Sequence, residues 1–477
     1  MSASPIAHEL ESITQEFSLE PFTESLQPLI DTALATHGKD QYREGTLLVP
    51  RLLVWFVLIL TLRRDKNYPQ VLNWLVSGFR WLGEHFPERA QLVSDGALSH
   101  ARKRLGPEVF ATLLRLQIAA LPHPEPDFHG YCSAAFDGTT GTMPDSALNS
   151  ATFGKPAARQ GTAAFPQVRL LALLALSVRH IYGLAWAPYR GKGTGERALL
   201  RSLLPTLPAG SWLYLMDAGL YAFDILWSLA AAPAAFLIKV PAHVKFGALQ
   251  PLGDGSYRAP LHGNILDPTH ASGYRATTLM VRLIRVEIRG FRPYWLATTL
   301  LDTTITPLDL ARHYHRRWII ELTYDEIKTH QCVTLRGQAP TTLRSRLPDL
   351  VTQEIYALAV MYNALRQLMT AAADIAHIPP GELSFVGCLE AIIEAAPFLT
   401  LRQKPHAEQY ARLLRTLAQY RLQPRKYLRR NPRVVKVKMS KWPRKQPHHR
   451  SQTYDLDQDL HIVVPKPIPN AQPTAPS

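Results

Sequence analysis

The order of apolar segments between residues 131 and 240 limits the possible folds of this chain more than any other feature. Alternating and continuous apolar runs predict three successive strands, a helix, a strand, a second helix and a last strand. Strands that alternate with helices in this way indicate an α/β sheet. The predicted elements are, in order, Tyr131–Asp137, Val168–Val178, His180–Pro188, Glu196–Leu204, Trp212–Met216, Phe223–Ala230 and Ala235–Val240.

The first and fourth of these strands each end in an aspartate, Asp137 and Asp217. The series matches the element order of a ribonuclease-H-like core, in which the first and fourth strands are neighbours. Both carboxylates would then lie at the sheet edge where open α/β folds place their sites. Taken singly, an aspartate at a strand end is more often a turn residue. The prediction therefore depends on what else reaches this edge.

A helix is predicted over Arg312–Gln331. Thr306, with Asp309 three residues later, matches an N-terminal cap, and Pro307 suits the first helical position. Apolar residues on both sides of its polar stripe predict that neighbours bury the helix and keep its carboxylate near a region of low dielectric constant.

One face of this helix combines an aromatic hydroxyl, two cations and a carboxylate. At about 100° per residue, these side chains fall within roughly 60° of one another. A charged helical face is more often simply solvated, but the upstream aspartates favour a site. The four residues, at spacings of three, four and seven, are Tyr314, Arg317, Glu321 and Lys328. Asp325 lies on the same face and competes with Glu321 as the relevant carboxylate.

Packed on the sheet, this helix could bring Glu321 to Asp137 and Asp217. Three converging carboxylates repel one another and raise their own pKa values unless cations neutralise them. All-oxygen ligands suit Mg²⁺ or Mn²⁺. Two such ions about 3.5–4 Å apart can activate an attacking oxygen and stabilise the leaving oxygen of a phosphodiester.

The N-terminal region is predicted to be helical, and one of its helices has the character of a DNA reader. The piece Ser94–Gly106 resembles the second helix of a helix-turn-helix, although many short basic helices have no such role. Its side chains available to a DNA groove are Ser99, His100, Lys103 and Arg104. Predicted helices around it span Glu20–Leu34, Leu52–Arg63, Gln70–Leu82 and Pro107–Leu121.

The rest of the chain completes the predicted domain organisation. Alternating segments at Thr277–Glu287 and Tyr294–Thr299 indicate an inserted β-domain, and Asp349–Ala371 and Leu383–Ala395 indicate helices. We expect a helical DNA-binding domain (1–127), the first part of the core (128–240), the inserted β-domain (241–300), the second part of the core (301–375), a helical and basic region (376–450) and a disordered tail (451–477).

The positive charge of the chain is concentrated near its C-terminus. The formal net charge is +15, and residues 411–450 contain 14 Lys or Arg and no Asp or Glu. Such a segment is either simply solvated or binds a polyanion, and we favour nucleic acid.

Other features bear on the cellular setting. The longest apolar run, Leu52–Leu62, is too short to span a bilayer, so we expect no membrane partner. The N-terminus has no export signal. The three cysteines, Cys132, Cys332 and Cys388, lack the spacing of a zinc site, and a reducing cytoplasm is the natural setting.

Several motifs together resemble the cut-and-paste DDE transposases of the insertion sequence four family. Tyr314, Arg317, Glu321 and Lys328 stand at the spacing of that family's Y-R-E-K signature. The surroundings agree over most of residues 40 to 445. They are FDGTT at Asp137, FGKPAARQGTAAFPQVRL from Phe153, a strand followed by Asp-Ala-Gly at Asp217, RRWIIE at Glu321, and VVKVKMSKWP near the C-terminus.

The resemblance implies that Asp137, Asp217 and Glu321 bind two metal ions, and that Tyr314, Arg317 and Lys328 grip phosphates of the transposon end. It implies a nick by water, attack by the freed 3′-hydroxyl, and joining to target DNA. The implied partners are double-stranded DNA, as terminal inverted repeats and target, and a second copy of the chain in a homodimeric synaptic complex. The implied location is the bacterial cytoplasm, in association with the nucleoid.

Two positions need separate comment. Relatives usually carry Asp-Arg-Gly-Phe at the second aspartate, whereas this chain has Ala218 after Asp217, which removes a cation beside the site. A related transposase stacks a tryptophan on a base flipped from the cleaved end, and Trp295 lies at the matching place. Trp295 could equally fill the core of the predicted insert.

Two alternative functions are compatible with the same fold. One is an inactive or domesticated transposase that binds terminal repeats as a repressor. The other is a ribonuclease-H-like nuclease that acts without strand transfer. The intact set of three carboxylates argues against the first, and the phosphate-gripping residues argue against the second.

Overall fold

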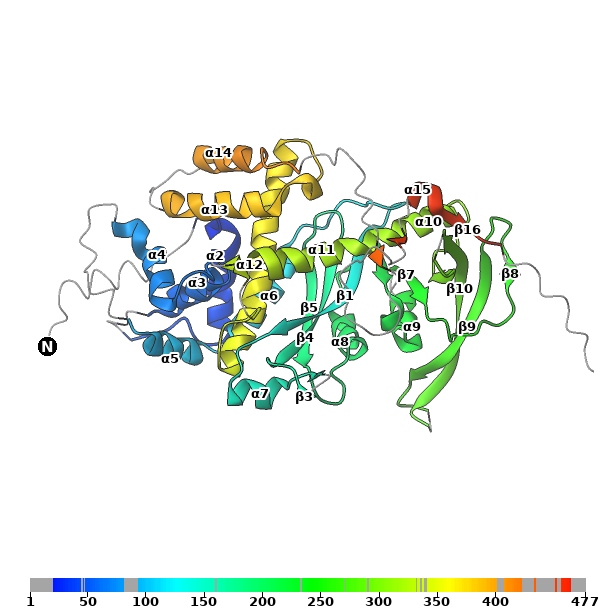
Figure 1. The fold of residues 1–477 in the computed structure, drawn as a ribbon, viewed down its shortest axis with the longest axis horizontal. Coiled ribbons are helices and arrows are strands. Elements are labelled where there is room, and N and C mark those ends of the chain that lie inside the picture. Colours follow the sequence, from blue (N-terminus) through cyan, green and yellow to red (C-terminus); the bar gives the residue numbers. More distant parts are fainter. Residues whose placement is uncertain are drawn as a thin grey trace, which may run out of the picture. The chain divides into compact units, whose positions relative to one another are not determined.

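The structure is a computed structural model. It describes residues 20–43, 46, 48–80, 93–158, 161–231, 234–270, 272–289, 291–331, 333–334, 337–338, 341–400, 407–422, 433–434, 451–452 and 456–464. The chain divides into two compact units, whose elements are labelled in Figure 1. The first unit comprises Met1–Glu125, Asp137–Pro208 and Ile319–Leu422, and the second comprises Pro126–Phe136, Ala209–Trp318 and Gln423–Ser477.

Helices from both ends of the chain pack together in the first unit. They are α2 (Thr23–Thr36), α3 (Pro50–Leu60), α4 (Tyr68–Arg80), α5 (Asp95–Leu105), α6 (Glu108–Ala120), α12 (Pro348–Ile375), α13 (Phe385–Thr400) and α14 (Ala407–Leu417). Every residue from Leu52 to Leu60 in α3 is buried, as its apolar sequence predicts. α12, yellow in Figure 1, packs against α3, α6 and α14. None of the described helices has the length and apolar character needed to cross a membrane.

The strands of the first unit follow the predicted order along the chain. β1 (Cys132–Thr142) enters this unit at Asp137, where the strand order is β5-β4-β1. β4 (Gln167–Ala175) and β5 (Ile181–Pro188) pair antiparallel, and α8 (Glu196–Leu203) packs against both. The short elements α7 (Ala147–Phe153), β2 (Ala157–Ala158) and β3 (Gly161–Thr162) lie between β1 and β4 in the sequence.

The expectation that Asp137 ends its strand is wrong. β1 continues to Thr142 through a segment with three threonines, which favour extended backbone. Close packing supports this extension, because a Cβ atom on Gly141 would lie 3.2 Å from Val168 of β4. Asp137 therefore lies inside β1.

In the second unit, a sheet of order β1-β6-β7-β11-β10-β9-β8 contains the other core strands. β6 (Trp212–Met216) pairs in parallel with the first residues of β1, so the predicted neighbours are confirmed. β7 (Ala235–Val240) pairs in parallel with β6, and α9 (Phe223–Ala231) packs against β7. The protein thus has a mixed α/β fold with a large sheet, and its elements follow the ribonuclease-H-like order along the chain.

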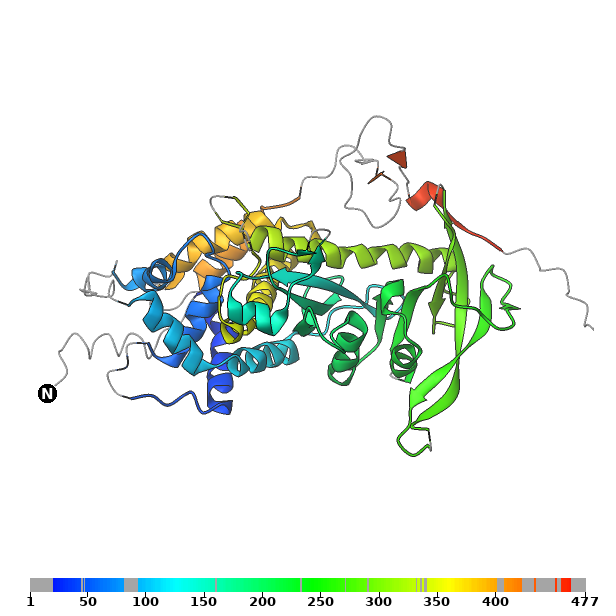
Figure 2. The same ribbon diagram turned by 60° about the horizontal axis from the view of Figure 1, so that its bottom comes forward.

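Strands from the predicted insert extend this same sheet. They are β8 (Gln250–Pro251), β9 (Tyr257–Leu266), β10 (Tyr274–Ile288) and β11 (Tyr294–Thr298). β11 pairs antiparallel with β7, which leaves no break between core and insert. Figure 2 shows β9 and β10 as a long two-stranded ribbon. A separate β-domain at 241–300 is therefore not seen, because the insert continues the hydrogen bonding of β7.

The disordered tail predicted for residues 451–477 contains ordered structure. β16 (Leu460–Ile462) pairs antiparallel with β10, and Leu460 is only 4% exposed. α15 (Leu456–Asp459) precedes it, and β15 (Ser451–Gln452) pairs with β14 (Arg433–Val434). The short apolar stretch finds an open edge of β10 beyond the end of β9, which composition alone does not reveal. Residues 465–477 and most of the basic segment 411–450 lie outside the described residues.

A buried histidine couples the stability of the second unit to pH. His313, on α10 (Pro307–Tyr314), is 6% exposed, stacks on Phe128 at a centroid distance of 3.9 Å, and its Nε2 lies 2.6 Å from Ser133 Oγ. Burial, and then the nearby Arg316, lowers the pKa of His313 to about 4. The folded protein thus holds this imidazole neutral at pH 7.

We expect the protein to lose stability as the pH falls from 7 to 5. The unfolded chain binds the His313 proton near pH 6.5 and the folded chain only near pH 4, so acid favours unfolding in this window. His313 should contribute about 2 kcal/mol to the loss. Denaturant unfolding at both pH values should show a smaller loss for His313→Gln. An equal loss in both proteins would place the proton uptake elsewhere.

Candidate active site

The predicted helix at residues 312–331 is helical throughout but is not one α-helix. The Thr306 hydroxyl accepts a hydrogen bond from Asp309 N at 3.1 Å, so the predicted cap is confirmed. After α10, the chain forms a 3₁₀ turn at His315–Trp318, then α11 (Ile319–Asp325), then a π-helical turn at Glu326–Gln331. The arrangement of four side chains within roughly 60° assumed a uniform α-helix, and the structure does not meet that assumption.

The boundary between the two units also falls in this segment, after Trp318. Tyr314 and Arg317 belong to the second unit, with Asp217, whereas Glu321 and Lys328 belong to the first, with Asp137. Residues three apart lie on the same face of a 3₁₀ turn, which suits Tyr314 and Arg317. Each unit therefore holds part of the predicted site.

In the first unit, the helical segment is attached to β1 beside Asp137. Tyr324 Oη donates a 2.6 Å hydrogen bond to the carbonyl oxygen of Asp137, and Lys328 Nζ donates to Thr139 Oγ1. The Lys328 ammonium also lies 5.9 Å from the centroid of the Tyr324 ring. Burial, and then the charge of Asp137, raises the pKa of Tyr324, so its hydroxyl stays protonated and donates. These contacts hold α11 and the π turn against the strand that carries Asp137.

Glu321 does not lie in an apolar setting. Its side chain is exposed, and its neighbours Trp318 and Leu322 are 40% and 52% exposed. The expected low-dielectric environment is therefore wrong, because only Ile320 of the flanking apolar residues is fully buried. Asp325 is exposed as well, and its Oδ1 accepts a 2.6 Å hydrogen bond from Thr329.

A second carboxylate, which the sequence reasoning missed, lies beside the Asp137 segment. A Cβ atom on Gly138 would lie 2.2 Å from Glu196 Oε1, so a larger residue at this position would displace the Glu196 side chain. The charge of Glu196 also contributes to raising the pKa of Tyr324, after burial and Asp137. Its place at the first residue of α8, the next element after the third core strand, was the signal available in the sequence.

In the second unit, Asp217 follows β6 and caps a short 3₁₀ turn, Ala218–Leu220. Its Oδ1 accepts hydrogen bonds from Gly219 N at 2.9 Å and Leu220 N at 3.2 Å. Asp217 therefore has the ordinary role of a turn residue. The same hydrogen bonds fix its carboxylate at the carboxyl end of β6. Ala218, which follows Asp217, places a methyl group where the family resemblance led us to expect an arginine.

A group of cations and rings surrounds Arg317 in the second unit. Burial, and then Arg317, lowers the pKa of Lys239 on β7, while Asp217 opposes this shift. Lys239 Nζ lies 4.6 Å from the centroid of the Tyr294 ring, and the Tyr294 and Tyr314 rings are 6.5 Å apart. Lys239 was missed, although a lone lysine in the apolar strand AFLIKV is a visible signal.

His315 is the histidine of this group, and its lowered pKa leaves the positive charge on Lys239 and Arg317. Burial, followed by Arg317 and Lys239, lowers the pKa of His315 to about 4, so this ring is neutral at pH 7. Arg317 is only 8% exposed, and its guanidinium carbon lies 5.5 Å from the Trp318 ring. Partly desolvated cations of this kind suit the binding of a phosphate.

The candidate DNA-reading helix is present as α5. Ser94 caps it by accepting a hydrogen bond from Ala97 N at 3.2 Å, and Gly106 ends it with a positive φ of 83°. Of its polar side chains, His100, Lys103 and Arg104 are exposed and Ser99 is half-buried. Residues 81–92, which would hold the turn before this helix, lie outside the described residues.

Trp295 is half-buried on β11 among side chains of its own unit. Its ring centroid lies 5.5 Å from that of Phe246 and 6.2 Å from that of Tyr257, both edge to face. The Arg285 guanidinium lies 5.2 Å from the ring. These contacts agree with a packing role, and the exposed part of the ring leaves base stacking as a prediction.

The three predicted carboxylates are candidate metal ligands. Among the described residues, no three His, Cys, Asp or Glu side chains are grouped so that they could hold a metal ion. The donor chemistry nevertheless suits a hard cation, because Asp137, Asp217 and Glu321 offer only carboxylate oxygens. By that criterion these residues fit Mg²⁺ or Mn²⁺.

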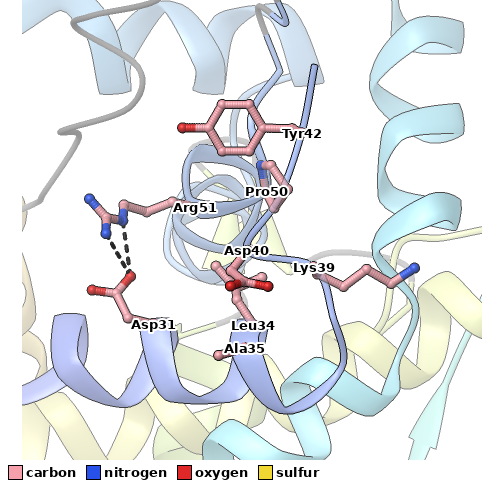
Figure 3. Close-up of a pocket in the computed structure, with 8 residues that line it drawn as sticks. All are labelled: Asp31, Leu34, Ala35, Lys39, Asp40, Tyr42, Pro50 and Arg51. Carbon is pink, nitrogen blue, oxygen red and sulfur yellow. Dashed lines mark hydrogen bonds and ion pairs between the residues drawn. The ribbon is translucent and has the colours of Figure 1, made fainter. Parts of the chain in front are cut away.

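A separate pocket of about 300 Å³ lies in the first unit, between α2 and the start of α3 (Figure 3). Asp31 and Arg51 form an ion pair of 2.9 Å at its side. The lining residues are Asp31, Leu34, Ala35, Lys39, Asp40, Tyr42, Pro50 and Arg51, and they include none of the predicted site residues.

Comparison with known proteins assigns the chain to a class. Residues 16–115 match the family "Insertion element 4 transposase N-terminal", and residues 129–364 match "Transposase DDE domain". The chain is 27% identical over 423 residues to "Transposase InsG for insertion sequence element IS4" of Escherichia coli (strain K12), which covers 87% of this chain and 91% of that protein. A cryo-EM structure of a piggyBac transposase synaptic complex with hairpin DNA aligns over 85% of this chain and 83% of that chain, with 9% identity. Its TM-score of 0.42 is too low to support a conclusion.

The matched domain defines the class of protein, a DDE transposase. The chain belongs to the insertion sequence four family of these proteins, and the resemblance inferred from its motifs is confirmed. DNA transposition and recombination are thus the processes in which such a protein takes part.

Removal of the Trp295 side chain should test its packing role. Trp295→Ala loses the contacts with Phe246 and Tyr257, and we expect a loss of about 2 kcal/mol in the free energy of unfolding. Trp295→Phe retains part of these contacts and should lose less than half as much. Denaturant unfolding measures both. Unchanged stability of Trp295→Ala would show that the ring does not hold the sheet together.

Proposed function

We propose that this protein is a cut-and-paste transposase that binds the terminal inverted repeats of its insertion sequence, cleaves DNA at the ends and joins them to target DNA. The observation that carries the proposal is the attachment of α11 and the π turn to β1, through Tyr324 on the Asp137 carbonyl and Lys328 on Thr139. It ties the helix of Glu321 to the strand of Asp137. In the second unit, β1 and β6 pair in parallel up to Ala135 and Leu215. Asp137 and Asp217 each follow two positions after these paired residues.

The proposed chemistry uses divalent metal ions, as DDE domains generally do. Asp137, Asp217 and Glu321 would hold two ions. When bound, the ions supply the Lewis acidity that activates the attacking oxygen and neutralises the leaving oxygen. Water attacks phosphorus and releases a 3′-hydroxyl, and this hydroxyl then attacks a second phosphodiester, so that no bond to the protein forms.

The phosphate contacts would come from the chain's own cations. Arg317 and Lys328 supply positive charge, and Tyr314 supplies a hydroxyl donor. Lys239, beside Arg317, adds a further cation on the side of the second unit. Because they are partly desolvated, these groups attract phosphate more strongly than exposed lysines do. We also propose that Trp295 stacks on a flipped base, in which case its replacement should slow hairpin formation more than the first nick.

The assembly and location follow the same proposal. Two copies of the chain would form a homodimer in the synaptic complex, each on one transposon end. The curated relative is bacterial, and the concentration of positive charge in residues 411–450 would favour association with the nucleoid.

A repeat-binding repressor is the competing function, favoured by one observation. Ala218 removes the cation that relatives carry beside Asp217. A repressor would still prefer terminal repeats over random DNA, but it would not cleave them in Mg²⁺. Cleavage by the natural protein therefore separates the two functions.

Alanine at any of the three carboxylates should abolish cleavage and preserve binding of transposon ends. The reason is that phosphate affinity comes from the cations, whereas catalysis depends on the metal ligands. Cleavage of a labelled transposon end in Mg²⁺ and gel-shift affinity are measured for Asp137→Ala, Asp217→Ala and Glu321→Ala.

Asp325→Ala is the matched control for Glu321→Ala. Both residues are exposed on α11, four positions apart, and loss of Asp325 removes only surface contacts with Thr329 and His330. Its cleavage should stay close to that of the natural protein. If Glu321→Ala still cuts, or Asp325→Ala alone fails, the metal ligand has been assigned to the wrong residue.

The exposed polar face of α5 should read the terminal repeats. Replacing His100, Lys103 and Arg104 together with alanine should lower the preference for repeat over random DNA by at least about tenfold, since each base contact contributes about 1–3 kcal/mol. Competition gel shifts measure the ratio. Arg115→Ala, on the neighbouring α6, is an exposed basic control and should keep it. A retained preference in the triple variant would place sequence reading on another element.

A further inference from the structure

A buried cluster of charges lies directly after α11. Glu326, with its side chain 11% exposed, accepts a 3.0 Å hydrogen bond from Arg179 and a closer one from Arg366. The Arg366 side chain on α12 is fully buried. Tyr362 Oη donates to Glu326 Oε2 at 2.8 Å and accepts from Arg366 Nε at 3.0 Å. Two guanidinium groups thus share one carboxylate in the interior of the first unit.

The π-helical turn lets this carboxylate and a second polar side chain face the same partner helix. Glu326 and Gln331 are five residues apart, which is the hydrogen-bonding interval of a π-helix and brings them to one face. Gln331 Nε2 donates to Leu358 O on α12 at 3.3 Å. In an α-helix, residues five apart would point about 140° away from each other. The two anchors are therefore compatible with the π turn and not with a regular α-helix.

The other side of the same turn meets β1. Lys328, two residues after Glu326, donates to Thr139, and Tyr324, two residues before it, donates to the Asp137 carbonyl. α12 and β1 are thus connected through a single turn of helix. Any change in the register of that turn would move Lys328 and Tyr324 relative to Asp137.

We propose that the cluster of Glu326, Arg179 and Arg366 is a positioning device for the reaction. By holding the π turn on α12, it places Lys328 on Thr139 and sets the position of α11, and hence of Glu321, against Asp137. Glu326 does not touch the substrate and acts through these residues. The inference rests on the proposed function, in which Glu321 and Lys328 serve cleavage.

Glu326→Gln is the direct test, because it keeps the shape and removes the charge that both arginines share. The rate of single-turnover cleavage of bound, labelled ends should fall about 10–100-fold, with less than a threefold change in affinity for the ends. Asp254→Asn is the matched control. It removes the carboxylate partner, 2.5 Å away, of Arg282, another fully buried arginine, in the second unit. Its cleavage rate should stay within threefold of the natural protein.

A double-mutant cycle separates positioning from general destabilisation. If Glu326 acts through Lys328, the double variant Glu326→Gln with Lys328→Ala should cleave within threefold of Lys328→Ala alone. Independent, multiplicative losses would overturn the proposal, and so would equal losses in Glu326→Gln and Asp254→Asn. Should Glu326→Gln fail to fold, the same measurements are made on Arg179→Gln. This variant removes one ion pair and leaves the pair of Arg366 and Glu326 in place.

A readout without cleavage keeps this inference distinct from the proposed function. Glu326→Gln should speed amide hydrogen exchange in residues 326–331 and increase acetylation of Lys328, whereas Asp254→Asn should change neither. Those changes should occur even if the natural protein does not cut DNA, in which case only the proposed function fails. Unchanged exchange and acetylation would overturn the positioning role itself.

Discussion

The hydrogen bonding of β1 is the constraint on which the rest of the structure depends. Its first residues pair in parallel with β6 in one unit, and its later residues accept Tyr324 and Lys328 in the other. The carbonyl of Asp137 itself accepts the Tyr324 hydroxyl, two positions after the last residue paired with β6, so its backbone is held on both sides. A carboxylate on a strand held in this way keeps its position better than one on a loop.

Charge inside the protein is the second recurring theme. Isolated buried charges are costly, and two of the fully buried arginines have carboxylate partners, Arg282 with Asp254 and Arg366 with Glu326. Near Asp217 the arrangement differs, since Lys239 lies close to the cation of Arg317 and its pKa is lowered. Under the proposed function, an incoming phosphate would stabilise these crowded cations.

Much of the fold could be predicted from sequence because its signals are local. β6 and β7 match the predicted ranges, since each is a short, mainly apolar run between turn residues, the pattern of a buried strand. The Thr306 cap is equally local. By contrast, β16 was assigned to a disordered tail, because its pairing partner β10 is more than 170 residues away in the sequence. Glu196 was missed for the same reason, since its significance comes from contact with Gly138.

The sequence by itself determined the order of strands and helices and, through its motifs, the family. The tertiary structure decided the helical register from Pro307 to Gln331. In the π turn, Glu326 and Gln331 bind α12 while Lys328 binds β1, as does Tyr324 just before the turn. A backbone geometry that distant partners impose leaves no periodic pattern in the chain, whereas an apolar strand or a capping threonine does. The physical reason is that the spacing of apolar residues depends on which face of a single element is buried. Side-chain contacts between distant elements exist only in the folded molecule and follow no regular spacing in the sequence.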